Sequence, residues 1–221
     1  AMVQAKGRII LVGDHRQLPH IVDDDIVRKI SQNGENVESV NKAIYTDSLF
    51  KRLFERMKAL ESIDGIKRTV TLNKQFRTHP LLGDFCSNNF YKKYSEDEAY
   101  ASPLPSSMFD QNLSDIANKA FVWIDVPHSV EKERKENGGG VTRKIEADTI
   151  KKYVSKWLAE DDKLTFGVIT FYRKQADMLE KDILKDELKL YNTDGVERLR
   201  VGTVDKFQGM EFDIVLLSTV R

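Results

Sequence analysis

The chain has 221 residues, of which 40% are hydrophobic and 32% charged, and this is enough apolar material for one packed domain or for one domain with part of another. Its 35 basic and 35 acidic residues cancel, so composition gives no support for a dedicated nucleic-acid-binding domain, although a local basic groove stays compatible with it. The sequence has no signal-like start and no apolar run near the roughly 18 residues that span a bilayer, so we expect an intracellular protein (cytoplasm or nucleus) without a membrane partner. It has a single cysteine and no histidine spacing typical of zinc ligands, so we expect neither a disulfide nor a structural metal.

Apolar runs and helical patterns alternate in the first part of the chain. Residues 8–12 are rich in Ile and Val and end at a Gly-Asp pair, which predicts a buried parallel strand that opens into a loop. Residues 48–60 place apolar side chains at helical spacing behind Ser48, a suitable N-cap. Residues 69–72 indicate another strand, and Pro80 begins another helix.

Strands and helices alternate more regularly in the second part of the chain. Residues 121–126 indicate a buried strand, whereas residues 128–140 are highly charged and end in three glycines, which predicts a mobile loop. The other expected elements are helices at 142–160 and 173–188 and strands at 166–170, 199–204 and 213–220. This alternation predicts an α/β fold, in which helices cover both faces of a parallel sheet. Ligands of such sheets bind at the carboxyl ends of the strands.

Two polar clusters follow the strands predicted in the first part of the chain. In residues 13–19 (GDHRQLP), Asp14 places a carboxylate beside the expected crevice and Gln17 can sense a phosphate oxygen. A tight turn with an Asp cap explains the same residues. In residues 75–80 (QFRTHP), Arg77 can pair with a phosphate and the preceding phenylalanine can stack on a base. The alternative is a solvated arginine beside a core phenylalanine.

Two further clusters follow strands predicted in the second part. Residues 170–175 (TFYRKQ) hold Tyr172 and Arg173, which can meet a nucleobase or a backbone phosphate, with a plain strand-to-helix turn as the alternative. Residues 203–213 (TVDKFQGMEFD) join two strands and are too polar for a simple connection. In this segment, Thr203 can bind a phosphate oxygen and Glu211 can accept hydrogen bonds from a ribose. Gly209 permits a close approach of the backbone to a ligand.

Taken together and in order, the clusters resemble the helicase motifs of superfamily 1, in the branch of the RNA-surveillance helicase of nonsense-mediated decay. The clusters at 13–19, 75–80, 170–175 and 203–213 are similar to motif III, motif IV, the motif before the next helix, and motif V. The family usually has Tyr and Met where this chain has Phe76 and Thr78, and it prefers Pro at Phe171. Glu146 and Ala147 add a weaker resemblance to the start of a later family helix.

The resemblance implies a RecA-like fold of the P-loop NTPase type, with ATP in a cleft between two such domains. It implies that Gln17 senses the γ-phosphate and that Arg77 is an arginine finger, so these two are the catalytic candidates. The residues implied to contact the nucleotide are Asp14, Gln75, Phe76, Gly209 and Glu211. Those implied to contact nucleic acid are Thr203, Tyr172 and Arg173, with Arg16 as a weaker candidate.

Two parts of such a motor are missing from the sequence. It contains no Gly-x-x-x-x-Gly-Lys-Ser/Thr loop to cradle phosphates and no Asp-Glu pair after a buried strand to hold Mg²⁺. We therefore expect a fragment of a larger helicase that stops before motif VI, with residues 1–67 as the tail of a first RecA-like domain and 68–221 as most of the second. ATP and Mg²⁺ would be cofactors of the parent protein, and the Mg²⁺ ligands would lie outside this chain.

The expected function follows from this organisation. The parent protein would be an ATP-dependent helicase or translocase, and this chain alone would be inactive. Its partners would be single-stranded DNA or RNA and the missing first RecA-like domain of the same parent chain. The alternatives are a degenerate RecA-like scaffold that binds protein or RNA without ATPase activity and, more remotely, a nuclease–helicase fusion.

Overall fold

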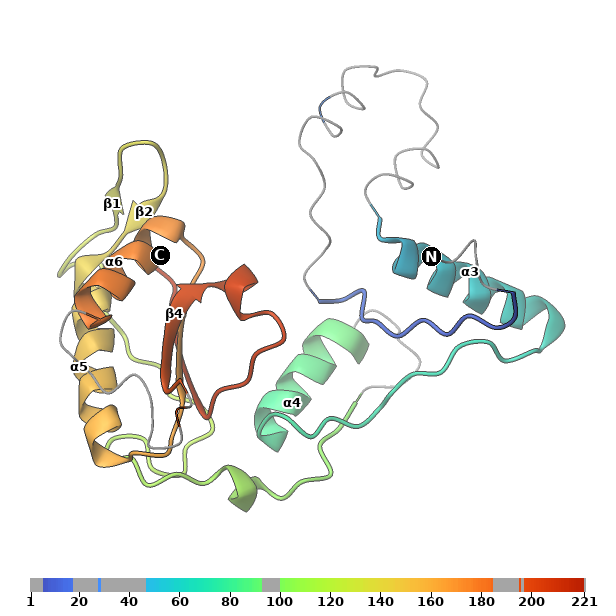
Figure 1. Cartoon of the computed structure of the whole chain (residues 1–221), viewed down its shortest axis with the longest axis horizontal. Coiled ribbons are helices and arrows are strands. Elements are labelled where there is room, and N and C mark those ends of the chain that lie inside the picture. The colour runs from blue at the N-terminus through green and yellow to red at the C-terminus, as the bar shows by residue number, and fades with distance from the viewer. Residues whose placement is uncertain are drawn as a thin grey trace. The chain divides into compact units, whose positions relative to one another are not determined.

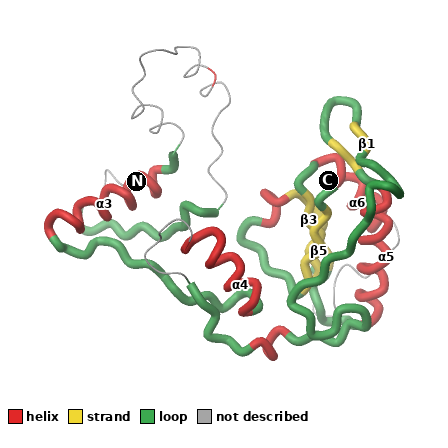
Figure 2. The backbone as a smooth tube through the Cα atoms, turned by 180° about the vertical axis from the view of Figure 1, so that it is seen from behind, coloured by secondary structure: helices red, strands yellow, loops and turns green. Residues whose placement is uncertain are grey.

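A computed structural model describes residues 6–17, 28, 47–92, 100–184, 195 and 197–220 (Figures 1 and 2). The chain divides into two compact units, each described below by itself. Unit 1 comprises Ala1–Lys74 and Asp84–Ala101, and unit 2 comprises Gln75–Gly83 and Ser102–Arg221. The domain boundary expected after residue 67 stays a prediction. No helix in the described part of the chain is both long and apolar enough to cross a membrane.

The helix predicted behind Ser48 is confirmed in unit 1 as α3 (Leu49–Asp64). The hydroxyl of Ser48 accepts a hydrogen bond from the backbone N–H of Lys51 at 3.2 Å and so caps the first turn. The helix ends at Gly65, whose φ of 70° lies in the left-handed region, and the N–H of Gly65 donates to the carbonyl of Glu61.

The next helix, α4 (Pro80–Cys86), begins at the predicted proline. It continues into a π-helical turn, Ser87–Tyr91. The boundary between the two units falls inside α4, after Gly83. A 3₁₀ turn, Ser106–Phe109, belongs to unit 2.

Two segments of unit 1 that were predicted to be strands are not strands. Residues 8–12 have no described strand beside them, and Val12 is 84% exposed. In residues 69–72, the backbone N–H of Thr69 donates to the carboxylate of Glu61 on α3 at 2.5 Å. A strand requires backbone partners on a neighbouring strand. Because a side chain supplies the partner here, the β-branched residues alone do not produce a strand.

Unit 2 contains the predicted parallel sheet. Its strands, in spatial order, are β4 (Leu199–Thr203), β3 (Phe166–Thr170) and β5 (Ile214–Ser218). The register places Thr170 of β3 opposite Thr203 of β4 and Ser218 of β5. The carboxyl ends of the three strands therefore meet at one edge of the sheet, where ligands of α/β folds bind.

Helices α5 (Lys144–Glu160) and α6 (Arg173–Leu184) pack together against one face of this sheet (Figure 1). The apolar side chains buried between them and the strands include Val154, Trp157, Phe166, Val168, Leu179, Ile183, Leu199 and Val201. The other face carries the rings of Phe207 and Phe212, which lie over Gly167 of β3. A Cβ at Gly167 would lie 2.9 Å from the ring of Phe212, so glycine is what allows the rings to approach.

Two other expectations for unit 2 need correction. Residues 121–126 are not a strand, and the carbonyl of Val126 accepts a hydrogen bond from the buried guanidinium of Arg143 at 2.5 Å instead of from another strand. The segment 128–140, which was predicted to be a loop, also contains a strand that pairs with residues 141–142 in an antiparallel hairpin. The strands of this hairpin are β1 (Arg134–Lys135) and β2 (Val141–Thr142).

Candidate functional site

Arg77 and Glu211 belong to two different motifs, 134 positions apart, and they form an ion pair in unit 2. The Nε of Arg77 donates to Oε1 of Glu211 at 2.5 Å. Both side chains are exposed, at 58% and 62%, so the pair stabilises the fold by only about 0–1 kcal/mol. Its main effect is on orientation. Glu211 holds the arginine by Nε and leaves the donors of both terminal nitrogens for another acceptor.

The side chain of Gln75 holds the backbone of Arg77 and Thr78 in place through hydrogen bonds. Its Oε1 accepts hydrogen bonds from the N–H groups of Arg77 and Thr78, at 2.9 and 2.8 Å, and its Nε2 donates to the carbonyl of Thr78 at 2.9 Å. The side chain lies against Gly83 of α4, where a Cβ would come within 2.7 Å of Nε2. The amide therefore shapes the turn, and the nucleotide contact expected of Gln75 stays a prediction.

The two other nucleotide candidates of unit 2 are Phe76 and Gly209. The side chain of Phe76 is 63% exposed, which is what a stacking platform for a base requires and what a core phenylalanine would not show. Gly209 has a φ of 82° and open space where a Cβ would stand. Its glycine is therefore explained by backbone conformation, whereas the close approach expected there stays a prediction.

The nucleic-acid candidates gather at the carboxyl edge of the sheet. Thr203 is the last residue of β4 and lies opposite Thr170, the last residue of β3. Tyr172 and Arg173 follow two and three positions later, at the start of α6. Arg173 forms an i,i+4 ion pair with Asp177 at 2.8 Å. The structure thus brings the three predicted contacts together at one edge.

A buried polar network behind this edge was missed at the sequence level. Arg143, at the start of α5, donates from Nη1 to Oε1 of Glu146 at 3.1 Å. The other oxygen of Glu146 accepts from the hydroxyl of Ser218 at 2.7 Å and from the N–H of Val220 at 3.1 Å. Gln175 exchanges hydrogen bonds with the backbone of Arg143 and donates to Ser218. The network ties the end of β5 to helices α5 and α6.

The only sign of this network in the sequence was the family-like Glu146-Ala147 pair and the position of Gln175 in a motif. The burial of Arg143 could not be predicted, because a sequence does not distinguish a buried arginine from a solvated one. Its side chain is buried here because backbone carbonyls and one carboxylate satisfy its donors.

The motif III residues lie in unit 1. Asp14 accepts hydrogen bonds from the N–H of Arg16 at 2.9 Å, from Nε2 of Gln17 at 2.8 Å and from the hydroxyl of Tyr91 at 2.5 Å. Burial of Tyr91 and its bond to Asp14 raise the pKa of the phenol, so it donates at every physiological pH. Asp14 therefore orients Gln17, as a phosphate sensor requires. Residues 18–19 of this motif lie outside the described part of the chain.

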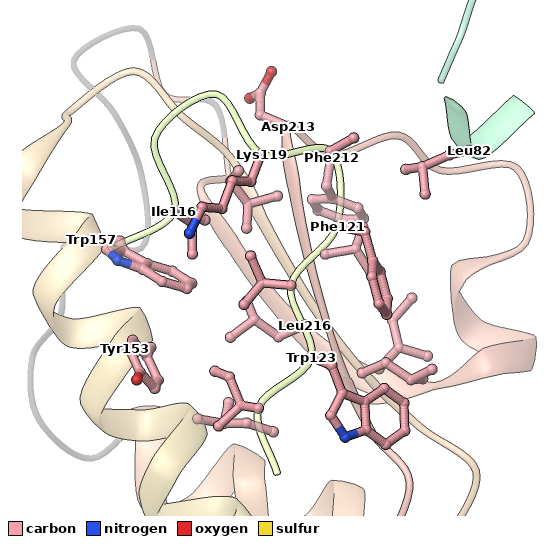
Figure 3. Close-up of a pocket in the computed structure, with 18 of the residues that line it drawn as sticks. Leu82, Ile116, Lys119, Phe121, Trp123, Tyr153, Trp157, Phe212, Asp213 and Leu216 are labelled. Atoms are coloured by element: carbon pink, nitrogen blue, oxygen red, sulfur yellow. The ribbon is translucent and has the colours of Figure 1, made fainter. Parts of the chain in front are cut away.

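A hollow of about 970 Å³ lies beside β5 in unit 2. Figure 3 shows Tyr153 and Trp157 of α5 on one side of it, Phe121 and Trp123 on the other, and Leu216 of β5 between them. Its lining also includes both members of the Arg77–Glu211 pair. Most of its wall is apolar, and its charged lining residues include Lys119 and Asp213 besides the Arg77–Glu211 pair.

The chain is similar to a described protein family and to several known proteins. A family model described as an AAA domain matches residues 45–221. The chain is 30% identical to the regulator of nonsense transcripts 1 of Caenorhabditis elegans, and 28% and 26% identical to the ATP-dependent helicases NAM7 of Saccharomyces cerevisiae and upf1 of Schizosaccharomyces pombe. Each match covers 100% of this chain but only 18%, 20% and 21% of the relative. The chain thus spans about a fifth of the length of these relatives.

Proposed function

The chain belongs to the AAA domain family that its residues 45–221 match, and we propose that it supplies part of an ATP-dependent helicase or translocase motor that acts on single-stranded DNA or RNA. Its parallel sheet is the RecA-like α/β fold of that family. The observation that supports the proposal best is the Arg77–Glu211 pair, because it joins the residues that two separate helicase motifs assign to the nucleotide.

In this proposal Arg77 is the arginine finger. A guanidinium has five N–H donors, and the bond to Glu211 occupies only the one on Nε. The terminal nitrogens can therefore donate in parallel to two phosphate oxygens while Glu211 keeps the plane of the group in place. Such prior orientation lowers the cost of aligning the positive charge with the negative charge that develops in phosphoryl transfer.

The other residues would bind and orient the nucleotide. ATP, when bound with Mg²⁺, supplies the phosphoanhydride bond whose hydrolysis drives motors of this kind. Phe76 offers an exposed ring for the base, and Gln75 holds the turn between that ring and Arg77. Gln17, oriented by Asp14, would sense the terminal phosphate. Ligands for Mg²⁺ and the loop that cradles the phosphates are expected on another RecA-like domain of the same parent chain.

The proposal is tested by ATP hydrolysis with and without single-stranded nucleic acid, in the full-length protein that contains this chain. Arg77→Ala should lower kcat by about 10³–10⁵-fold and change nucleotide binding far less, since the finger acts in the transition state. Arg56→Ala is the matched control, because it removes the same charge from an exposed position on α3. It should keep the parent activity.

Two results would contradict this function. One is a full-length protein whose hydrolysis is absent or not stimulated by nucleic acid, which would favour the scaffold alternative. The other is robust hydrolysis by the 221-residue chain on its own, which would mean that it does not need a second domain.

A further inference from the structure

The β1–β2 hairpin separates its positive from its negative charges. The segment before and within it contains equal numbers of both signs, so its sequence looks neutral. The acidic side chains are half-buried and the basic ones are exposed: Glu131, Glu133 and Glu136 in the first group, and Lys132, Arg134 and Lys135 in the second. The surface that solvent meets is therefore basic.

Each acidic residue is engaged within the protein. The carboxylate of Glu131 accepts a hydrogen bond from the N–H of Ile145 at 2.6 Å and so caps the first turn of α5. The carboxylate of Glu136 accepts one from the hydroxyl of Thr142 at 2.7 Å. Glu133 lies 3.7 Å from Nε2 of His128. Hydrogen bonds thus hold the carboxylates of Glu131 and Glu136, whereas Glu133 lies beside a histidine.

The basic residues have no comparable partners. In the described part of the chain, Lys132 and Lys135 form no ion pair, and Arg134 has only a contact of 3.9 Å to Glu136. The side chain of Arg134 is 83% exposed. All three can therefore meet an external anion without first breaking a strong internal bond.

Arg143 anchors the base of the hairpin. It is only 4% exposed, and it donates from Nε to the carbonyl of Glu131 at 3.1 Å and from Nη2 to the carbonyl of Val126. Its own N–H donates to Gln175 of α6 at 2.8 Å. The hairpin is thus attached to the buried network at the carboxyl end of β5.

This attachment places the hairpin beside the predicted nucleic-acid contacts. Figures 1 and 2 show it next to α6, and β2 contacts that helix. Directly before β2, a Cβ on Gly140 would lie 3.0 Å from Cγ of Lys174, the residue after Arg173. Gly140 has a φ of 91°, which only glycine adopts readily. The hairpin backbone therefore lies directly beside the start of α6, which carries Arg173 and Lys174.

We propose that the β1–β2 hairpin binds the phosphate backbone of the single strand and extends the contact surface of Thr203, Tyr172 and Arg173. This inference rests on the proposed function, and it adds an element that lies outside the motifs resembling those of the family. Lysine and arginine side chains bind phosphates without reading bases, so the contact should not depend on sequence. Three exposed cations allow up to three phosphate contacts.

The test measures binding of fluorescein-labelled oligo(U) and oligo(dT) by anisotropy over a series of salt concentrations, in the full-length protein without nucleotide. The variant Lys132→Gln/Arg134→Gln/Lys135→Gln should bind about 10–100-fold more weakly, and the slope of log K against log salt should fall by about 0.7 for each lost contact, about 2 in all. The matched control, Lys152→Gln/Lys163→Gln/Lys181→Gln, removes three exposed charges of unit 2 away from the hairpin and should keep both values.

A further variant keeps the charge but changes the side chain. Lys132→Arg/Lys135→Arg should bind like the parent, which also answers the objection that the first variant is misfolded. The inference is overturned if the glutamine variant, with an unchanged circular dichroism spectrum, keeps the parent affinity and salt slope, as it would if the hairpin instead met an acidic protein. Stimulated ATP hydrolysis would then still support the proposed function. If the parent protein binds neither strand, the proposed function itself fails.

Discussion

Removal of the Glu146 carboxylate is the sharpest test of the buried network. In Glu146→Ala, the Arg143 guanidinium stays buried without its counter-ion, and the hydroxyl of Ser218 and the N–H of Val220 lose their acceptor. Breaking a buried ion pair from one side costs about 3–5 kcal/mol. The free-energy cost does not exceed this range, because the carbonyls of Glu131 and Val126 still accept hydrogen bonds from the Arg143 guanidinium. Glu146→Gln retains an acceptor and should lose about 1–3 kcal/mol.

Urea unfolding followed by tryptophan fluorescence measures this cost. Both tryptophans, Trp123 and Trp157, lie in unit 2, so their signal follows the unit that contains the network. With a slope of about 2 kcal/mol per molar urea, the alanine variant should shift the midpoint down by about 1.5–2.5 M. Asp148→Ala is the matched control on the same helix. Its exposed i,i+4 pair with Lys144 is worth at most about 0.5 kcal/mol.

The reasoning would be refuted by a small effect. If Glu146→Ala lowers the free energy of unfolding by less than about 1 kcal/mol, the carboxylate is not the partner that makes burial of Arg143 tolerable. A loss equal to that of Asp148→Ala would lead to the same conclusion.

Two other predictions concern packing and pH. Gly167→Ala should destabilise unit 2 by about 1–3 kcal/mol, because the new methyl group meets the rings of Phe207 and Phe212, and a wild-type urea midpoint would contradict the packing described here. In unit 1, the guanidinium of Arg68 and then the N–H of Ile66 lower the pKa of Asp64 from its ordinary 3.8 to about 2. The lowered pKa favours folding above pH 3.8, and this contribution is lost as the pH falls toward 2. A carboxyl NMR titration should show the low pKa, and Arg68→Ala should return it toward 3.8, whereas an unchanged pKa in that variant would exclude Arg68 as the cause.

Local patterns in the sequence predicted the local structure well. The Ser48 cap and the helical spacing after it yield α3, and the apolar run at 166–170 yields the central strand β3. In both cases the information lies within a few residues of the element. The run at 8–12 is also rich in apolar residues, but no described strand lies beside it and it is not a strand. Strand formation depends on the neighbouring segments as well as on the residues of the run itself.

The candidate site shows the same limit. Arg77 and Glu211 were predicted separately, each from its motif, whereas their contact depends on the path of the chain between them. The exposure of the basic residues of the hairpin could not be predicted either, since a run of mixed charges gives no sign of which side chains will be half-buried. Only the bonds of Glu131 and Glu136 decide that.

Val220 connects the buried network to a strained part of the backbone. Its φ of 68° lies in the left-handed region, which costs a β-branched residue about 1–3 kcal/mol, and its side chain is fully buried. The hydrogen bond from its N–H to Glu146 helps to hold that strained turn. The backbone at the end of β5 is therefore strained, and Glu146 is one of the groups that hold it in this conformation. Glu146 thus couples the charge balance of Arg143 to the backbone conformation at the end of β5.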